Sequence, residues 1–321
     1  MTVDSKVRQS SPAVRSKRLG SLRRRLNMDW QLYLIILLPL IWLIVFQYIP
    51  MYGAQIAFRK FQATKGIVGS DWVGLANFAK FFQSYNFKKV IVNTLAVSFY
   101  DLIVGFPFPI ILALLLNNCL RPRFKKITQI VTYMPYFIST VVMVGMIIQF
   151  TSPKVGIINF ARQAMGLSAI DFMAIPGYFR HIYVWTNIWQ GSGWNAIIYL
   201  SALAAIDPGL HEAAMIDGAS RWKRMIHVDI PGIFPTITVL LILRAGQIMN
   251  VGFEKMFLMQ NPLNLDASEI ISTYVYKQGL AAAAPDFSYA SSIGLFNSVI
   301  NLILICTVNY VSNKLSETSL W

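Results

Sequence analysis

The chain has 321 residues, of which 55% are hydrophobic and only 13% charged, and its formal net charge is +14. A soluble domain carries roughly twice that charged fraction, and the apolar residues here form blocks of about 20, the length that crosses a bilayer. Composition therefore excludes an ordinary soluble protein and predicts an all-α, polytopic membrane protein. Aromatic stacking motifs for RNA are absent, so we assign the positive charge to the cytoplasmic side of a membrane protein and expect no nucleic-acid partner.

The first segment, residues 1–29, is rich in Ser, Arg and Lys, and we expect a disordered cytoplasmic tail. Contact with membrane lipid and a fully solvated tail both fit it. Residues 30–87 are expected to hold the first transmembrane helix, Trp30–Ile49, and most of an outer loop, 50–89. A Phe-rich stretch, 77–82, predicts a short helix at the surface within that loop.

The middle of the chain predicts three more spans. Span two is 90–116, with polar Asn93 and Asp101 inside it and helix-bending Gly105, Pro107 and Pro109. A short basic loop, 117–126, leads to span three, 127–150. Residues 151–180 lie outside with one short helix, and span four is 181–206.

A polar stretch, 207–235, follows span four. Asp207 is a good N-cap, Pro208 suits the first turn, and 210–217 predicts a short helix ended by Gly218 in the left-handed conformation. Ser220 can cap a second helix, which we expect to stop near Pro231. Two short helices at a glycine corner make a knob that projects from the membrane.

Spans five, 230–253, and six, 286–311, complete a count of six, with an outer loop 254–285 between them and a tail 313–321 after them. An even count places both termini on one side. Basic residues crowd the N-terminal tail and the 117–126 loop, so we predict cytoplasmic termini and a cytoplasmic knob.

The amino-acid sequence of the knob resembles the EAA loop of bacterial ABC importer permeases. Its small and acidic residues stand in the order and spacing of that loop, and they are Glu212, Ala213, Ala214, Asp217, Gly218, Ala219 and Pro231. In the family this loop couples the permease to a separate ATPase. The alanines permit close approach, and the two carboxylates offer charge-assisted hydrogen bonds to a basic partner. Local capping and pairing with Arg221 or Lys223 is the alternative role for the two acids.

The resemblance covers about residues 88–312 and implies a type I ABC importer permease fold in the bacterial cell membrane. It implies four kinds of partner: a second homologous permease, two cytoplasmic ATPases, an extracytoplasmic solute-binding protein and a sugar or oligosaccharide. ATP and Mg belong to the ATPases, and no cofactor is expected in this chain. The overall texture resembles the sugar-importing branch, of the LplB-like, alginate and rhamnogalacturonan type. Asp229, in Asp229-Ile230-Pro231, departs from the family, which usually has a Thr or other small neutral residue before a Leu-Pro pair.

Enzyme signatures are missing. The sequence has no Walker A, HExxH, GxSxG or CxxC pattern, so we expect no catalytic residues and no ATP site. His181, His211 and His227 lack metal-ligand spacing, and the latter two are expected to be solvated or to face a partner. The two cysteines, Cys119 and Cys306, are expected to be free thiols.

Spans four and five hold the candidate substrate pathway. Sugars need hydrogen-bonding groups beside flat aromatic faces, and this mixture is supplied by Asn187, Trp189, Gln190, Trp194, Asn195, Arg244, Gln247 and Asn250. The last three recur at helical spacing. Helix packing is the alternative role for each, because amides commonly join spans. An arginine at that depth must face a water-filled cavity or an acid such as Asp101.

Three rival functions stay open from the sequence. A permease of this fold can carry another solute, such as an amino acid, a peptide or phosphate. A membrane scaffold that partners an ATPase without transport would carry the same knob. An intramembrane enzyme fits least, because no nucleophile–base pair is present.

Overall fold

The computed structural model describes residues 30–316, which fall into two compact units that meet between Gln55 and Ile56. The tail predicted at 1–29 lies outside the described residues, as does 317–321. Residues 313–316, which we expected to begin the C-terminal tail, instead continue the last helix.

The first unit is one helical run. It begins as α2 (Trp30–Leu43), passes through a π-helical turn (Ile44–Tyr48) and α3 (Ile49–Met51), and continues in a 3₁₀ turn (Tyr52–Phe58) that enters the second unit. The run is long and apolar enough to cross a membrane, and no residue of α2 is buried. It extends beyond the predicted Ile49 because Pro50 occupies the first turn of α3, where its missing N–H costs little.

The second unit begins with a small hairpin. Strands β1 (Arg59–Gln62) and β2 (Ser70–Trp72) pair antiparallel, with Arg59 opposite Trp72, and α4 (Gly66–Gly69) connects them. The Arg59 guanidinium donates hydrogen bonds to the carbonyls of Val68 and Ser70, at 2.9 and 2.8 Å, which closes the turn. Helix α5 (Ala76–Gln83) confirms the short helix predicted at 77–82.

Helices make up most of the rest of the second unit. Its α-helices are α6 (Asn86–Tyr100), α7 (Pro107–Asn117), α8 (Pro122–Tyr133), α9 (Thr140–Thr151), α10 (Ile157–Ala164), α11 (Pro176–Ala204), α12 (Pro208–Ile216), α13 (Arg221–Arg224), α14 (Ile230–Ala245), α15 (Phe253–Met259), α16 (Leu265–Ser268), α17 (Ile271–Tyr276) and α18 (Phe287–Ser316). Three π-helical turns, Asp101–Gly105, Met225–Asp229 and Lys277–Ala281, join or extend them.

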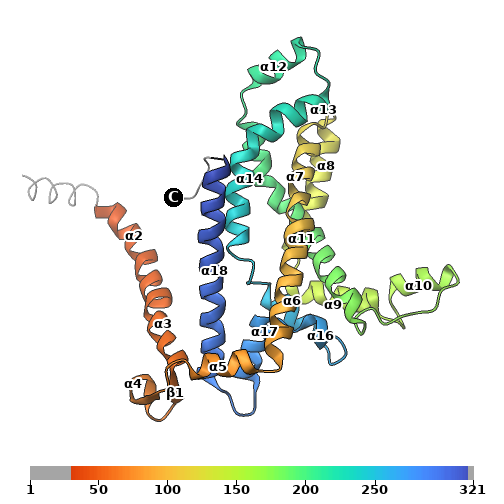
Figure 1. Ribbon diagram of the computed structural model, residues 1–321. Coiled ribbons are helices and arrows are strands. Elements are labelled where there is room, and N and C mark those ends of the chain that lie inside the picture. The colour runs from red at the N-terminus through yellow and green to blue at the C-terminus, as the bar shows by residue number, and fades with distance from the viewer. Residues whose placement is uncertain (1–29, 317–321) are drawn as a thin grey trace, which may run out of the picture. The chain divides into compact units, whose positions relative to one another are not determined.

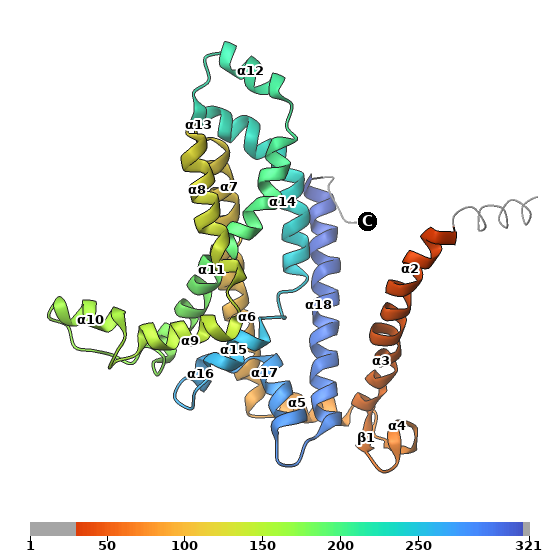
Figure 2. The ribbon, with the colours of Figure 1, turned by 180° about the vertical axis from the view of Figure 1, so that it is seen from behind.

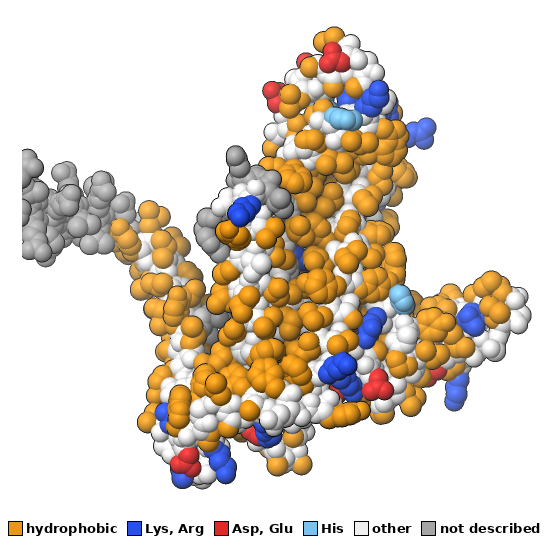
Figure 3. Space-filling model, viewed as in Figure 1, with side chains coloured by type: hydrophobic (Ala, Val, Ile, Leu, Met, Phe, Trp, Pro, Cys, Tyr) orange, Lys and Arg blue, Asp and Glu red, His pale blue; other side chains and the backbone are white. Residues whose placement is uncertain are grey.

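The long helices of this unit run side by side (Figures 1 and 2). One end carries the turn between α7 and α8, the α12–α13 corner and the end of α18, and the other carries α5, α16 and α17. Figure 3 shows hydrophobic side chains over the length of these helices and charged ones over the α12–α13 end. This distribution is that of a bundle whose middle faces lipid.

Four helical runs of the described residues are long and apolar enough to cross a membrane: Trp30–Phe58, Asn86–Asn117, Arg221–Ala245 and Phe287–Lys314. A bent pair, Pro122–Phe137 with Thr140–Thr151, makes a fifth. Helix α11 has 29 residues, enough length to span, but it is more polar than these runs. The expected six spans are compatible with this set.

The third span differs from the predicted straight helix over 127–150. Helix α8 begins earlier, at Pro122, so Arg123, Lys125 and Lys126 lie on it and not in a loop. After a 3₁₀ turn (Met134–Phe137) the chain bends by 99° into α9. Pro135 cannot donate to the preceding turn, and the Ser139 hydroxyl accepts from the N–H of Val142, which starts a new helix.

The helix after the glycine corner also differs from its prediction. It does not stop near Pro231, because α13, the π-helical turn and α14 form one run from Arg221 to Ala245. The wide turn ends at Asp229 and places Pro231 in the first turn of α14. The run then ends at Ala245, short of the expected Phe253. Gln247 and Asn250 consequently lie in an unwound segment, and the helical spacing predicted for them was wrong.

Candidate functional site

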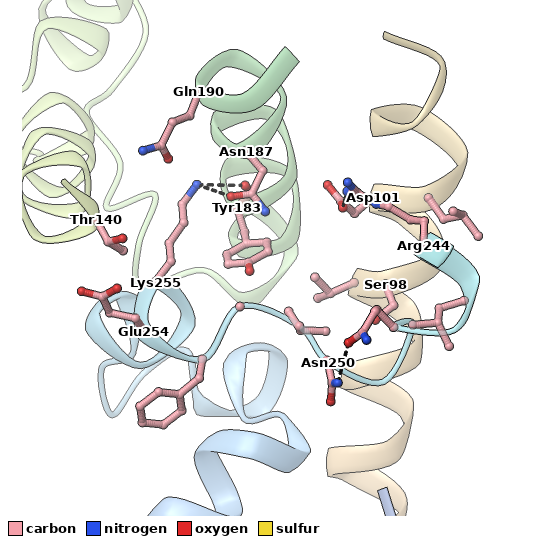
Figure 4. A pocket seen from close by; sticks show the side chains of 17 residues that line it. Ser98, Asp101, Thr140, Tyr183, Asn187, Gln190, Arg244, Asn250, Glu254 and Lys255 are labelled. Carbon is pink, nitrogen blue, oxygen red and sulfur yellow. Dashed lines mark hydrogen bonds and ion pairs between the residues drawn. The ribbon is translucent and has the colours of Figure 1, made fainter. Parts of the chain in front are cut away.

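Several predicted polar residues meet in a cavity of about 520 Å³ in the second unit (Figure 4). The cavity is bounded by α6, the start of α9, α11, the unwound segment after α14, and α15. Asn187, Gln190, Arg244, Gln247 and Asn250 all line it, as the sequence predicted. Its volume lies within the roughly 300–1,000 Å³ of small-molecule sites.

Arg244 and Asp101 form an ion pair at one side of this cavity, between the Nη2 atom and the Oδ2 atom. Of the two surroundings that the sequence allowed for Arg244, a cavity or an acid, the structure shows both. Asp101 begins the π-helical turn after α6, and Arg244 lies in the last turn of α14, so the contact joins two segments 143 residues apart. The arginine keeps 42% of its side chain exposed, against 19% for the aspartate. Its remaining N–H groups are therefore available to a ligand.

Lys255 lies at another wall and was missed by the sequence analysis, which placed it in an outer loop. Its residue is only 6% exposed. The ammonium donates to the Asn187 Oδ1 atom at 2.6 Å and the Thr186 Oγ1 atom at 2.8 Å, and it lies 5.2 Å from the Tyr183 ring centroid. The sequence feature that could have indicated it is a lysine within the largely apolar run 253–259. When such a run packs against the bundle, its lysine is buried with it.

The carboxylates of the cavity do not pair with Lys255. Asp101 is occupied by Arg244, and the exposed Glu254, although it also lines the cavity, is not within ion-pair distance. All atoms that accept from the ammonium are neutral oxygens, including the Tyr183 carbonyl at 3.5 Å. Burial lowers the pKa of Lys255 to about 7, although the charge of Asp101 acts to raise it, so the protonated form is costly here unless a ligand supplies an anion.

The segment from Gly246 to Gly252 forms the floor of the cavity and is held by side chains. The Asn301 Oδ1 atom of α18 accepts from the Met249 N–H at 3.1 Å. The Asn250 amide donates to Gln247 at 2.8 Å and accepts from Asn297 at 2.9 Å. Unwound backbone is tolerated at membrane depth only where protein or a cavity satisfies its polar groups.

The remaining three residues predicted for the pathway do not line this cavity. Asn195 lines an adjoining cavity of about 260 Å³ that shares Asp101, Arg244, Asn187 and Gln190 with the first. Trp189 lines an apolar cavity between α7, α8 and α11. Trp194 stacks on Tyr136, with ring centroids 4.6 Å apart and ring planes at 5°, beside the bend that follows α8.

The glycine corner has the predicted geometry. Asp207 caps α12, with its Oδ1 atom accepting from the Gly209 N–H at 2.9 Å. Gly218 has φ +75°, and the N–H groups of Gly218 and Ala219 donate to the carbonyls of Met215 and Ala214. This Schellman arrangement ends the helix in one residue. The Ser220 hydroxyl then accepts from the Lys223 N–H at 3.4 Å and caps α13.

The corner is exposed along its length. No residue of α12 is buried, and Ile216 and Met215 are 87% and 51% exposed. Glu212 and Asp217 are exposed and form no ion pair among the described residues, so pairing with Arg221 or Lys223, the alternative role, is not found. Exposed apolar side chains between free carboxylates have the composition of a surface for a protein partner.

The three histidines lie apart from one another. His181 Nδ1 lies 2.8 Å from the Tyr100 hydroxyl, His227 Nδ1 lies 2.9 Å from the Lys223 carbonyl, and His211 contacts Asp229. His227 is exposed, as expected, whereas His211 is partly covered. The described residues hold no cluster of three or more potential metal ligands. Cys119 and Cys306 are free thiols.

Comparison with known proteins gives concordant matches. Residues 105–317 match the family described as the binding-protein-dependent transport system inner membrane component. The chain is 37% identical to Protein LplB of Bacillus subtilis (strain 168), over 98% of both chains. It is 40% identical to the polygalacturonan/rhamnogalacturonan transport system permease protein YteP of the same organism, over 90% of both.

A solved structure is similar over nearly the whole fold. It is a chain of a bacterial ABC transporter involved in the import of the acidic polysaccharide alginate, with a TM-score of 0.84 and 38% identity. The match covers 92% of this chain and 99% of that one. The family match spans well over half of the sequence, and the relatives exceed 30% identity across nearly all of it. The chain therefore belongs to the family of inner-membrane components of binding-protein-dependent transport systems.

Proposed function

We propose that this chain is one of two related permease subunits of an ATP-driven importer for oligosaccharides. The observation that carries this proposal is the cavity of about 520 Å³, which offers amide, hydroxyl and charged groups beside the rings of Tyr183 and Phe253. Sugars are bound by such mixtures of hydrogen-bonding groups and flat apolar faces. The names of the relatives support it, since they include carriers for polygalacturonan, rhamnogalacturonan and alginate.

The α12 corner is the surface that docks on a cytoplasmic ATPase, which binds ATP and Mg. Its support is the match to the EAA order of residues and the exposure of Glu212, Asp217 and Ile216. This role places the α12 end of the bundle in the cytoplasm. The turn after α7 and the end of α18 lie at that same end (Figures 1 and 2), and six spans then give cytoplasmic termini.

Transport follows by alternating access. An extracytoplasmic binding protein delivers the oligosaccharide to the α5 end, and the sugar enters the cavity. Closure of the paired ATPases moves α12, and the helices that bound the cavity change their tilt, so that access on one side opens as access on the other side closes. Hydrolysis resets the arrangement. The chain itself contributes binding groups and moving helices, and the energy comes from the ATPase subunits.

The substrate is acidic in this proposal, and Lys255 is its charge partner. Arg244 is neutralised by Asp101, whereas Lys255 is buried among neutral oxygens, so a sugar carboxylate is the group that compensates it. A hydrogen bond between ammonium and carboxylate, in which both groups are charged, is stronger than the bond to a neutral amide oxygen that it replaces. Asn187, whose Oδ1 atom accepts from the ammonium at 2.6 Å, is the residue that exchanges with the substrate.

The test is uptake by the complete importer in proteoliposomes with its binding protein. Labelled acidic oligosaccharide is compared with its carboxyl-reduced, neutral counterpart, and amino acids, peptides and phosphate serve as further substrates. Uptake of the acidic sugar, dependent on ATP, supports the proposal. Uptake of one of the other solutes in its place contradicts the sugar assignment, and absence of any ATP-dependent uptake contradicts transport.

Lys255→Gln tests the charge partner. Because glutamine keeps the hydrogen bonds but not the charge, we expect acidic sugar uptake to fall by about ten-fold or more, with the neutral analogue little changed. Lys154→Gln, on an exposed lysine outside the cavity, is the matched control. Equal loss for both sugars would show that Lys255 serves packing and not selection.

A further inference from the structure

A carboxylate is completely buried where α14 begins. Asp229 is 0% exposed and closes the π-helical turn Met225–Asp229. Its Oδ2 atom accepts from the Asn118 amide at 3.0 Å, and Asn118 caps the end of α7. Its Oδ1 atom lies 3.3 Å from the His211 Nε2 atom, on α12. Three segments that are far apart in sequence thus meet at one acid.

This cluster is the tie between α12 and the bundle. Among residues 30–316, the His211–Asp229 pair is the only ion pair or side-chain hydrogen bond that joins α12 to another helix. Otherwise α12 is attached through its two chain ends, one at Asp207 and one at Gly218, whose φ of +75° marks a sharp corner. A displacement of α12 without this tie would be absorbed by those turns.

The contact has room to change. The Oδ1 atom is buried and has no hydrogen bond of normal geometry, although the His211 Nε2 atom lies 3.3 Å away. Leaving a buried acceptor without a hydrogen bond costs about 1–3 kcal/mol, and the cost is higher for a charged acceptor. A small movement of α12 toward α14 completes the bond, and a movement away exposes the acid. The cluster is thereby sensitive to the position of α12 in a way that a relaxed hydrogen bond is not.

We propose that His211, Asp229 and Asn118 form a coupling latch. Through it, a displacement of α12 moves the start of α14 and the end of α7. These are positioning residues, since none of them touches substrate or nucleotide. The latch rests on the proposed docking role of α12. It gives a role to the buried acid at position 229. It reaches the cavity directly, because α14 ends at Arg244 and Ala245 and α7 continues the helix that carries Asp101.

The experiment measures sugar moved per ATP hydrolysed by the complete importer in proteoliposomes. Asp229→Asn keeps an acceptor for Asn118 and removes the charge, and His211→Gln keeps a donor and removes the imidazole. We expect each variant to hydrolyse ATP at close to the wild-type rate and to move about five-fold less sugar per ATP, since coupling free energies are commonly of this size. The double variant should be no worse than either single one.

His227→Gln is the matched control, because this neighbouring histidine is exposed and contacts only the Lys223 carbonyl. The amount of sugar that this variant moves per ATP hydrolysed should equal that of the wild type. If Asp229→Asn fails to assemble, Asp229→Thr, which has a small neutral side chain with a hydroxyl that can still accept from Asn118, takes its place. Losses that add in the double variant, or equal losses of uptake and hydrolysis, would overturn the latch.

Failure of the docking role is distinguishable from failure of the latch. Glu212→Lys with Asp217→Lys tests docking through binding of the ATPase subunits, which is scored by co-purification. If that variant keeps its ATPases and wild-type uptake, the docking role is wrong. If it loses them while the latch variants keep a normal ratio, docking stands and the latch alone is overturned.

Discussion

A few charged side chains lie inside the second unit, and each is stabilised by specific partners. Asp101 and Arg244 are each unfavourable at membrane depth, and each is tolerated because the other lies beside it. Lys255 is stabilised differently, by neutral oxygens of α11, and Asp229 by an amide and an imidazole. Three of these residues lie at the cavity, and Asp229 lies at the latch.

The Asp101–Arg244 pair predicts a non-additive pattern of stability. Asp101→Asn or Arg244→Met alone leaves one charge unpaired, and we expect a loss of about 1–3 kcal/mol, less than for a fully buried pair because Arg244 is partly exposed. The double variant should recover most of that loss. The thermal midpoint of the purified complex in detergent measures it, and equal, additive losses would contradict the pairing.

Asp286 predicts a dependence of stability on pH. Burial acts to raise the pKa of this carboxyl, but hydrogen bonds from Lys80 and from the Tyr289 and Ser288 N–H groups outweigh it, so its pKa lies below the ordinary value. A folded-state pKa that is lowered contributes stability above the unfolded pKa, near 4, and loses it as pH falls through the folded value.

The comparison of wild type with Asp286→Asn checks this sign. The variant should have the lower thermal midpoint at pH 7, and the difference should shrink as the pH falls below about 4. The effect should be small, because the Lys80–Asp286 pair is largely exposed. A difference that grows as the pH falls would contradict the assignment.

At the scale of elements, close approach of helices is as important as apolar surface. Gly193 of α11 faces the backbone of α8, where an added Cβ would lie 2.0 Å from the Thr132 carbonyl oxygen. The two helices can touch only because this residue has no side chain. The Tyr136–Trp194 stack lies beside this approach and pairs the turn after α8 with the same helix.

Gly193→Ala should therefore destabilise the fold by about 1–3 kcal/mol, because the backbone of α8 cannot move aside as a side chain can. Gly145→Ala on α9 is the matched control, since nothing lies within 4 Å of its added Cβ, and it should be neutral or slightly stabilising. Thermal midpoints of both variants give the answer. Equal behaviour of the two glycines would rule out the close approach.

Sequence patterns predict some elements well and others poorly. The caps at Asp207 and Ser220, the corner at Gly218, the surface helix α5 and the Asp101–Arg244 pair all follow from local rules or from the cost of buried charge. The bend after α8, the long run through Pro231 and the end of α14 at Ala245 do not. The run through Pro231 contains a π-helical turn, and the segment after Ala245 is held by Asn297 and Asn301 of α18, from more than 40 residues away.

The candidate site divides in the same way. Amide and arginine positions on α11 and α14 were found because polar residues within apolar runs are conspicuous. Lys255 was missed because a lysine near the end of a span looks like an ordinary loop residue until α15 packs against α11. Trp189 and Trp194 were assigned to the pathway by composition, and the structure places them outside the main cavity.

For the whole molecule, the decisive feature is the separation of the two proposed sites. The cavity is lined by the unwound segment at one end of α14. The glycine corner lies beyond the other end of the same helical run (Figure 1). Importers of this family must couple the two across that distance. The corner should accordingly be essential for uptake and dispensable for insertion into the membrane.

Gly218→Pro tests this separation, since proline fixes φ near −65° and the corner needs +75°. We expect abolished uptake with normal membrane insertion, measured by transport and by membrane fractionation. Gly218→Asn is the matched control, because asparagine tolerates the left-handed conformation, and it should keep most of the activity. The charge-reversed Glu212→Lys, Asp217→Lys chain should behave as the proline variant does, and wild-type uptake by it would contradict the docking role.

The break at Ala245 has an evolutionary implication. Helix α14, which leads from the proposed docking corner, and helix α15, which carries Lys255, are separated by an unwound segment that hydrogen-bonds to Asn297 and Asn301 of α18. Substitutions on α15 can therefore change which substrate is bound without altering the residues of α12 to α14. A change of substrate during evolution then needs substitutions only in that short helix and its neighbours, and the coupling segment from α12 to α14 can stay the same.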